Sequence, residues 1–463
     1  MTAPTILHDV SRRAFLQRSA ALGMAGVAAP LVTTLGAIGE AAAATASDYK
    51  ALVCVFLQGG NDHYNTLVPY DPTSHALYAT ARGGLTLGRD VLQPTALVPG
   101  NDLGGRAYAF APAMAPLNPL FDAGRLAVAL NVGTLIQPTT RTQYFNKSVR
   151  LPPKLFSHND QQSFFQASSP EGAVSGWGGR IGDLYQSGNG SATLTCINAS
   201  GNAVFLTGRQ AIQYNVGTGG PVSLLRGATS LYGSSTAAQT LRQLMTDSNP
   251  HLFGSEYARV NKRAVDTQAQ LANALAGVPD STFPLFPSGN SLADQLRMVA
   301  RMIAISSEVG AKRQVFFVAM GGFDLHDSLA ANQPVVLARL ATAMRAFHDT
   351  TAAMGVADKV TTFTGSDFGR TLASNGNGVD HGWGSMHFVM GGAVKGKRLY
   401  GTAPAIGHNT NDDVGQGRLI PTMSVDQYAS TLARWFGVSD GDLTTVLPNI
   451  GNYDKSTWSQ GFV

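Results

Sequence analysis

Short apolar runs that end at glycines are the feature that most restricts the fold of this sequence. Residues 51–57, 126–132 and 314–320 are almost entirely apolar, and glycines follow each run closely. A run of this kind is typical of a strand buried on both faces of a parallel sheet, because a strand with one face in water alternates apolar and polar residues. The sequence therefore predicts a sheet covered by helices on both sides.

Segments with helical spacing alternate with these runs. Helices followed by strands at intervals along the chain are typical of a doubly wound, mostly parallel α/β sheet flanked by helices. The predicted elements are helix 114–123 before strand 126–133, forming one β-α-β unit with strand 51–57; helix 292–309 before strand 314–320; helix 334–354 before strands 359–363 and 388–390; and a final helix over 425–436.

One segment departs from this alternation. Residues 188–235 are rich in Gly, Ser, Thr and Asn, with short apolar runs that suggest hairpins or loops, and helical spacing follows over 241–275. We interpret residues 188–285, approximately, as a Gly/Ser-rich insertion. The preferred organisation is one elaborated domain over residues 47–463.

The N-terminus has the order of a twin-arginine export signal. Arg12 and Arg13 precede Phe15 and Leu16, an uncharged stretch follows over 19–39, and small residues occupy 41–46. Residues 1–46 are therefore predicted to be a signal peptide, recognised by the twin-arginine translocase and removed, which gives a periplasmic or secreted protein with no stable membrane span. The alternative is a membrane anchor, but the stretch is rich in Gly and Ala and barely reaches the about 20 strongly apolar residues that a bilayer requires.

Composition excludes two classes of protein. The net charge is only +4, and Lys and Arg form no dense run, so nucleic acid is not an expected partner. Cys54 and Cys196 are the two cysteines, too few for a disulfide-rich scaffold or a thiolate metal cluster. Two alternatives remain for them: they form a disulfide outside the cytoplasm, or Cys54 is a small buried apolar residue.

Polar clusters beside glycines follow the predicted strands, where an open α/β sheet collects its ligands. Carboxylates and imidazoles that converge without cysteine suit Zn²⁺ or Mn²⁺, and oxygen-rich variants suit Mg²⁺ or Ca²⁺. Each Asp taken singly is equally compatible with a helix cap or a turn. Because Asp recurs with His in three clusters, we predict a polar site. The clusters span residues 59–63, 321–328, 365–371 and 380–387.

Motifs distributed through most of the chain also resemble a known family. They are Phe56–Asp62, Val68–Tyr70, Leu120–Val128, Ser157–His158, Gly322–His326, Ser366–Thr371, Asp380–Gly384 and Gln427–Val438. Together they resemble the bacterial domain-of-unknown-function 1501 family, within the alkaline phosphatase and sulfatase superfamily. The resemblance implies an alkaline phosphatase-like fold whose strand ends hold one or two metal ions and a Ser, Thr or modified Cys nucleophile for hydrolysis of phosphate or sulfate esters.

The resemblance also implies a set of metal ligands drawn from the clusters, with a divalent cofactor that is Zn, Mn or Ca. The first strand would supply one ligand, the middle strand a pair, and the later loops the rest, with His387 in reserve. The ligands implied are Asp62, Asp324, His326, Asp367, Asp380 and His381.

Two residues are candidates for direct roles in the chemistry. Ser157 precedes a predicted helix, and the free N–H groups of a helix N-terminus bind phosphate and stabilise an oxyanion, so Ser157 is a candidate nucleophile. The alternative is an N-cap box of Ser157 with Asp160. Arg370 is a candidate for holding the oxyanion, and a structural ion pair is its alternative role.

Two departures from the superfamily pattern keep a second function open. Asp367 is followed by Phe368 where superfamily hydrolases commonly place a His, and the spacing of Asp324 and His326 is shorter than usual. The leading hypothesis is an exported metal-dependent hydrolase of a small-molecule or polymer ester. The rival is a non-catalytic exported protein, for binding or envelope biogenesis, that retains the hydrolase fold. Trp383 is a candidate for stacking on a sugar or base, with buried packing as the alternative.

Overall fold

The computed structural model describes residues 46–224, 230–248 and 250–463. Residues 1–45, which carry the predicted twin-arginine signal, lie outside the described residues. Across the described ranges, every helix is too short or too polar to cross a membrane.

A ten-stranded sheet forms the centre of the molecule, with the order β13-β4-β12-β9-β1-β8-β5-β6-β7 and with β14 paired to β4. Strand β1 (Lys50–Leu57) pairs in parallel with β8 (Arg313–Met320) on one side and β9 (Val360–Ser366) on the other. Strand β12 (Ser385–Gly391) is antiparallel to both of its neighbours, β4 (Leu126–Gly133) and β9. The remaining strands are β5 (Cys196–Asn198), β6 (Tyr214–Gly217), β7 (Gly220–Pro221), β13 (Leu399–Tyr400) and β14 (Met423–Ser424).

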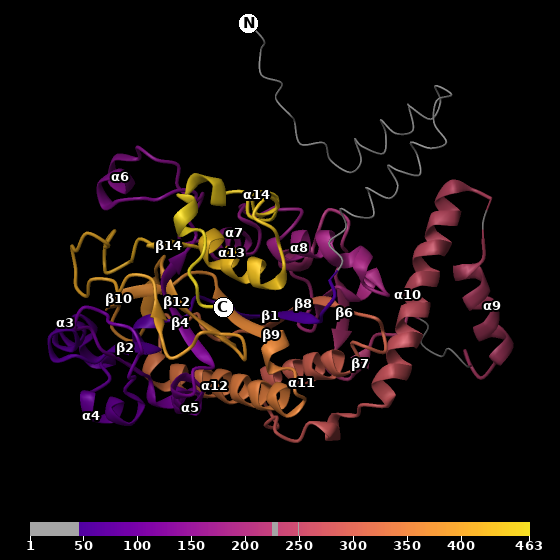
Figure 1. The fold of residues 1–463 in the computed structure, drawn as a ribbon, viewed down its shortest axis with the longest axis horizontal. Helices are drawn as coiled ribbons and strands as arrows, with labels where there is room; N and C mark the ends of the chain where they lie inside the picture. The colour runs from indigo at the N-terminus through magenta and orange to yellow at the C-terminus, as the bar shows by residue number, and fades with distance from the viewer. Residues whose placement is uncertain (1–45, 225–229, 249) are drawn as a thin grey trace, which may run out of the picture.

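Helices cover both faces of this sheet, so the predicted mostly parallel, doubly wound α/β fold is confirmed. Figure 1 shows α11 (Ser291–Ala304) and α12 (Leu329–Ala353) below the sheet, and α7 (His158–Ala167), α8 (Trp177–Tyr185) and α13 (Val425–Phe436) above it. Alternate residues of β1 enter two different cores: Val53 and Val55 join one, and Leu52, Cys54 and Phe56 join the other. This division follows from the two-residue period of a strand.

The remaining elements are shorter helices and two small antiparallel pairs of strands outside the central sheet. The helices are α3 (Pro72–Arg82), α4 (Arg89–Leu92), α5 (Asn118–Asp122), α6 (Arg141–Asn146) and α14 (Leu443–Val446), and two small antiparallel pairs are formed by β2 (Leu67–Pro69) with β3 (Tyr108–Phe110) and by β10 (Arg370–Ser374) with β11 (Val379–His381).

Two expectations about the elements are corrected, and the direction of one strand is new. The β-α-β unit does not join adjacent strands, because β9 and β12 lie between β1 and β4. Helix α12 begins at Leu329 instead of Pro334, which lies inside the helix and removes one backbone hydrogen bond without ending it. Strand β12 enters the sheet antiparallel, a direction that its apolar residues do not encode.

The segment predicted as an insertion is partly sheet and partly a helical projection. Within residues 188–285, β5 pairs in parallel with β8 and so belongs to the central sheet. The predicted helix over 241–275 is two helices, α9 (Ser235–Thr246) and α10 (Leu252–Ala276). They form a hairpin that projects from the side of the molecule, as Figure 1 shows.

The sheet order decides between the two alternatives for the cysteines. Cys54 lies on β1 and Cys196 on β5, and β8 separates these strands. Two strand spacings amount to about 9–10 Å, whereas a disulfide requires Cα atoms within about 7 Å. Both thiols are free and buried, so the disulfide alternative is wrong and the buried apolar role of Cys54 is confirmed.

We therefore expect both thiols to be unreactive in the folded protein. Burial raises the pKa of Cys196 to about 12 and raises that of Cys54 as well, so neither forms the reactive thiolate. Titration with a thiol reagent under non-reducing conditions is expected to detect no thiol before unfolding and both afterwards. Detection of neither thiol in denaturant would indicate a disulfide and contradict this strand order.

A buried carboxyl group at the start of α13 is expected to make stability depend on pH. Burial raises the pKa of Asp426 from 3.8 to about 6, against hydrogen bonds from Asn449 and Ser168 that lower it. The folded protein thus binds this proton more tightly than the unfolded chain, and the stabilisation is complete below pH 3.8 and lost as the pH rises through about 6. That difference corresponds to about 3 kcal/mol. Urea unfolding of the protein and of Asp426→Asn across this window measures it, and parallel curves would contradict it.

Candidate metal centre

Tight turns bring the loops after β1, β8 and β9 together at the carboxyl edge of the sheet. Gly59 and Gly60 follow β1 after one residue and have φ angles of +112° and +82°. A Cβ on Gly59 would lie 2.5 Å from the backbone nitrogen of Asp324, and one on Gly60 would lie 2.5 Å from the ring of Phe368. Glycine is therefore required twice here, both for the backbone conformation and for the close approach of the neighbouring loops.

Three side chains from separate segments converge at this edge. The ligand atoms of His158, Asp324 and His381 all lie within 4.8 Å of one another. Nε2 of His158 is 3.5 Å from one carboxylate oxygen of Asp324, and Nε2 of His381 is 3.6 Å from the other. Each side chain is partly exposed, so the group is open to a solute. Two imidazoles and a carboxylate form a donor set that could hold a metal ion.

Hydrogen bonds fix the orientation of both imidazoles. Nδ1 of His158 is 2.6 Å from Oδ2 of Asp367, and Nδ1 of His381 is 2.7 Å from the carbonyl oxygen of Phe156. Because Nδ1 of each ring has an acceptor, Nε2 of each ring faces Asp324. Histidines that bind a metal through one ring nitrogen commonly donate from the other nitrogen to an acceptor in this way. The hydrogen bond to Asp367 raises the pKa of His158, whereas burial lowers that of His381.

The acceptor for His381 depends on an unusual backbone conformation. Phe156 has a φ of +72°, which is rare for a bulky residue and costs conformational energy. This turn immediately precedes α7, whose first residue is His158. The same short segment thus supplies one imidazole of the group and holds the other.

His326 adds a fourth possible ligand at the exposed side of the group. Its Nε2 is 2.9 Å from Nε2 of His381 and 3.2 Å from Oδ1 of Asp324. Its Nδ1 is 3.3 Å from Asp380, whose carboxylate also accepts a hydrogen bond from Asn375. That hydrogen bond and His326 lower the pKa of Asp380, despite partial burial. Asp380 therefore orients His326 in the way that Asp367 orients His158.

Arg370 is buried beneath this group. Its guanidinium donates to carbonyl groups of the strand-end loops, to Nε2 of His326 at 3.4 Å and to Asp324, Nη2 to Oδ1 at 2.5 Å, so all its donors are in use. The side chain is fully buried. Burial alone would raise the pKa of Asp324, but the hydrogen bond and charge of Arg370 outweigh it and hold the pKa below its usual value. The ion pair with Asp324 agrees with the structural alternative, and the oxyanion role of Arg370 stays a prediction that this geometry does not support.

The structure places the six predicted ligands in three different positions. Asp324, His326 and His381 lie together with ligand atoms facing one another, whereas Asp367 and Asp380 stand behind two of the imidazoles. Asp367 is buried and also accepts hydrogen bonds from the backbone of Gly59 and the side chain of Gln162. Asp62 lies elsewhere, in a buried ion pair with Arg82. Its assignment as a ligand stays a prediction that this geometry does not support.

Ser157 lies at the N-cap of α7, next to His158. Its hydroxyl donates to Oδ2 of Asp160 at 3.0 Å and makes no cap bond to the backbone, so the alternative N-cap box is not formed. The assignment of Ser157 as nucleophile stays a prediction.

Two other candidates belong to the core. His387 is buried on β12, where burial lowers its pKa to about 3 and its ring packs against Phe165 and Tyr428. The indole of Trp383 is buried and donates to the carbonyl oxygen of Thr134 at 2.7 Å. Trp383 therefore has the packing role that was the alternative to stacking on a ligand.

His158 is the member of the group that the sequence did not assign as a ligand. The only signal for it was the Ser157–His158 pair among the family motifs, directly before a predicted helix. Its importance depends on the approach of α7 to the end of β9, where Asp367 lies, and that contact joins residues far apart in the sequence.

Comparison with known protein families identifies the family of the chain. A family model described as "Protein of unknown function (DUF1501)" matches residues 49–448. The chain belongs to the DUF1501 family. No curated protein matches this DUF1501 chain.

Solved structures similar to the DUF1501 chain include three hydrolases. A sulfatase from Bacteroides thetaiotaomicron, studied for metabolism of multiple glycosaminoglycans, has 10% identity and a TM-score of 0.33, and the match covers 85% of this chain and 74% of the sulfatase. TAB5 alkaline phosphatase, in a mutant with Mg bound, has 8% identity, a TM-score of 0.28 and coverage of 75% and 91%. A mutant of the alkaline phosphatase PafA has 10% identity, a TM-score of 0.27 and coverage of 70% and 64%. At these TM-scores the likeness carries no argument about function.

Proposed function

We propose that this DUF1501 protein is an exported metal-dependent hydrolase of phosphate or sulfate esters, carried out of the cytoplasm by the twin-arginine translocase. The observation that supports it is the convergence of His158, His381 and Asp324, with both imidazoles oriented by acceptors behind them. Such acceptors fix the ring and its tautomer, which a metal-binding imidazole needs and a surface histidine does not. Export rests on the Arg12-Arg13 motif.

The residues fit a divalent metal ion. Nε2 of His158 is buried and has no hydrogen-bond partner among the described residues. This nitrogen therefore faces the group as a possible metal ligand that no hydrogen bond occupies. Two or three imidazoles with one carboxylate favour Zn²⁺, and Mn²⁺ next, over Ca²⁺, which takes about six to eight oxygen ligands. His158, Asp324 and His381 would hold the ion, with His326 beside them. A bound ion would polarise the ester and lower the pKa of a water molecule.

The chain's own residues would orient and deliver the reacting groups. Ser157 is adjacent to His158, and its hydroxyl already donates to a carboxylate, Asp160, which could accept its proton. The N-terminus of α7 favours negative charge at this point. Arg370 would hold Asp324 in place through its bond to Oδ1.

One observation favours the non-catalytic alternative. The ring of Phe368 packs against His158 and His381, with centroids 4.8 and 4.6 Å away, and so covers one side of the group. A covered ion has fewer open positions for a substrate, as structural sites do. A binding or envelope-biogenesis protein that retains the site is therefore the second candidate.

An ester screen with metal removal tests the proposal. The mature protein, purified after export, is assayed with aryl phosphates and aryl sulfates before and after dialysis against a chelator. We expect hydrolysis of one ester class, its loss on chelation, and its recovery on addition of Zn²⁺ or Mn²⁺. Bound metal without hydrolysis of either class would favour the second candidate, and hydrolysis that survives chelation would contradict the metal dependence.

Ser157→Ala separates two routes within the proposal. Retained turnover would assign the attack to water, and loss of turnover with normal metal content would assign it to Ser157. Thr240→Ala, on the exposed surface of α9, is the matched control.

A further inference from the structure

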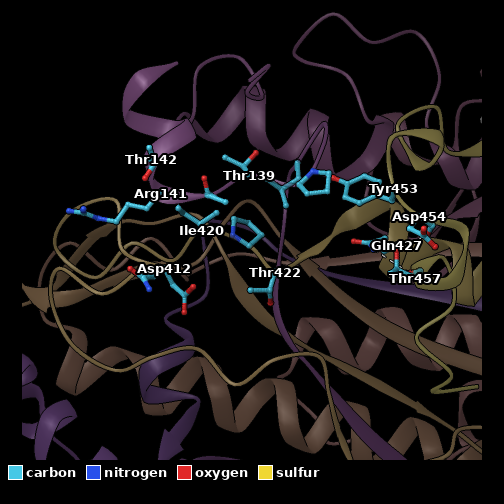
Figure 2. A pocket seen from close by; sticks show the side chains of 15 residues that line it. Thr139, Arg141, Thr142, Asp412, Ile420, Thr422, Gln427, Tyr453, Asp454 and Thr457 are labelled. Carbon is cyan, nitrogen blue, oxygen red and sulfur yellow. Dashed lines mark hydrogen bonds between the residues drawn. The ribbon is translucent and has the colours of Figure 1, made fainter. Parts of the chain in front are cut away.

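A cavity outside the metal centre is lined by side chains that none of the preceding assignments uses. It has a volume of about 640 Å³. Three segments surround it: residues 135–142 after β4, residues 411–422, and the C-terminal segment around Tyr453. Figure 2 shows the segment leading into α6 on one side of this space and the other two segments facing it. Sites for small ligands commonly have volumes of about 300–1,000 Å³.

The lining combines an apolar floor with a polar rim. Leu135, Ile420 and Tyr453 are buried in the floor, whereas Thr422 and Asp454 are exposed at the rim. Five of the fifteen lining residues are threonines. Three of their hydroxyls already form hydrogen bonds within the protein, those of Thr139, Thr140 and Thr457, whereas Thr142 and Thr422 are exposed at the rim. A hydroxyl both donates and accepts hydrogen bonds, and a carboxylate accepts them, so these two threonines with Asp412 and Asp454 suit a ligand that carries hydroxyl groups. The floor suits the C–H faces of the same ligand.

The charges at the cavity disfavour an anion. Asp412 and Asp454 contribute two carboxylates against a single cation, Arg141. The guanidinium of Arg141 is already engaged, because Nε donates to the carbonyl oxygen of Asp413 and the group lies over the ring of Phe145. A hydrocarbon chain is disfavoured as well, since it would bury rim hydroxyls and carboxylates without hydrogen bonds.

We propose that this cavity binds a neutral saccharide. The site is distinct from the metal centre, but residues 411–422, part of which line the cavity, also reach that centre: Arg418, which is outside the lining, donates to the carbonyl oxygen of His381 at 2.7 Å. A saccharide in the cavity would thus contact a segment that supports the loop carrying His381. The proposal does not depend on ester hydrolysis, because binding is measured directly.

Titration calorimetry with defined oligosaccharides tests the site. The metal-loaded mature protein is titrated with maltotetraose, cellotetraose and tetra-N-acetylchitotetraose, and with tetragalacturonate as an anionic comparison. We expect at least one neutral tetrasaccharide to bind. Thr422→Trp, which fills the cavity from its rim, is expected to weaken that binding at least about tenfold. Thr240→Trp, on the exposed surface of α9, is the matched control.

A second variant keeps the test valid if Thr422→Trp folds poorly. Asp412→Asn retains an acceptor for the backbone of Ala405 and removes only the charge, and it is also expected to weaken binding about tenfold. The proposal is overturned if no neutral tetrasaccharide binds at millimolar concentration, if tetragalacturonate binds as tightly, or if both cavity variants bind unchanged. Metal content and ester turnover, measured in the same samples, report separately on the metal centre.

Discussion

His381→Ala is expected to reduce the bound metal of the purified protein from about one ion per chain to almost none. Nε2 of His381 is one of only three ligand atoms in the central group, and its loss would leave His158 and Asp324 to hold the ion with His326 at the exposed side. Ester turnover, if present, is expected to fall with the metal. Elemental analysis of protein purified without added metal measures the effect, and circular dichroism confirms the fold.

Three further variants make this result specific. Asp324→Ala is expected to lose the ion as completely as His381→Ala. Asp367→Asn removes only the charge behind His158, and we expect a weaker effect, about 10–100-fold in metal affinity. Asp327→Ala changes an exposed carboxylate on the same loop as Asp324 and is expected to retain the ion. Full metal content in both His381→Ala and Asp324→Ala would refute the site.

Asp62→Ala is expected to lower the free energy of unfolding by about 3–5 kcal/mol. Asp62 and Arg82 form an ion pair in which both side chains are almost fully buried. Removing the carboxylate would leave the guanidinium charged in the interior, with the ring of Tyr64 5.5 Å away as its nearest compensation. Urea unfolding with matched curves for the parent protein measures the loss.

The second member of the pair provides the control. Arg82→Met in the Asp62→Ala background removes the orphaned charge, so the double variant is expected to be more stable than Asp62→Ala alone. Glu256 forms an exposed ion pair with Arg259, and Glu256→Ala is expected to change the free energy of unfolding only slightly. Metal content distinguishes the two roles of Asp62. Loss of the ion from a folded Asp62→Asn variant would support the assignment of Asp62 as a ligand. Retention of the ion would leave the ion pair with Arg82 as its role.

The strands were the most predictable part of this fold. The apolar runs of β1, β4 and β8 identify strands buried on both faces, because both sides of the sheet are covered by helices. The direction of β12 was not predictable, since a strand that packs against the same two cores is equally apolar in either direction. The three-residue strand β5 was too short to separate from the surrounding loops.

The candidate site was predictable to the level of loops but not of individual ligands. The glycines and carboxylates after β8 and β9 indicated the right edge of the sheet. Asp62 follows β1 in the same way, yet α3 brings Arg82 to it, and nothing near Asp62 in the sequence records that contact. Asp367, which the sequence suggested as a ligand, instead lies behind His158, to which the sequence assigned no role, because α7 places an imidazole in front of the carboxylate.

The reversed strand has a topological consequence for the chemistry. In an all-parallel sheet, one edge collects only segments that leave strands, and the segments that enter strands lie at the opposite edge. Because β12 runs against β4 and β9, the segment entering it arrives where β9 ends. His381 belongs to this incoming segment, and Asp367 to the outgoing one. A single reversal thus lets one short stretch of chain leave the sheet, form the β10–β11 ribbon and return, supplying both His381 of the candidate metal centre and the carboxylate that orients His158.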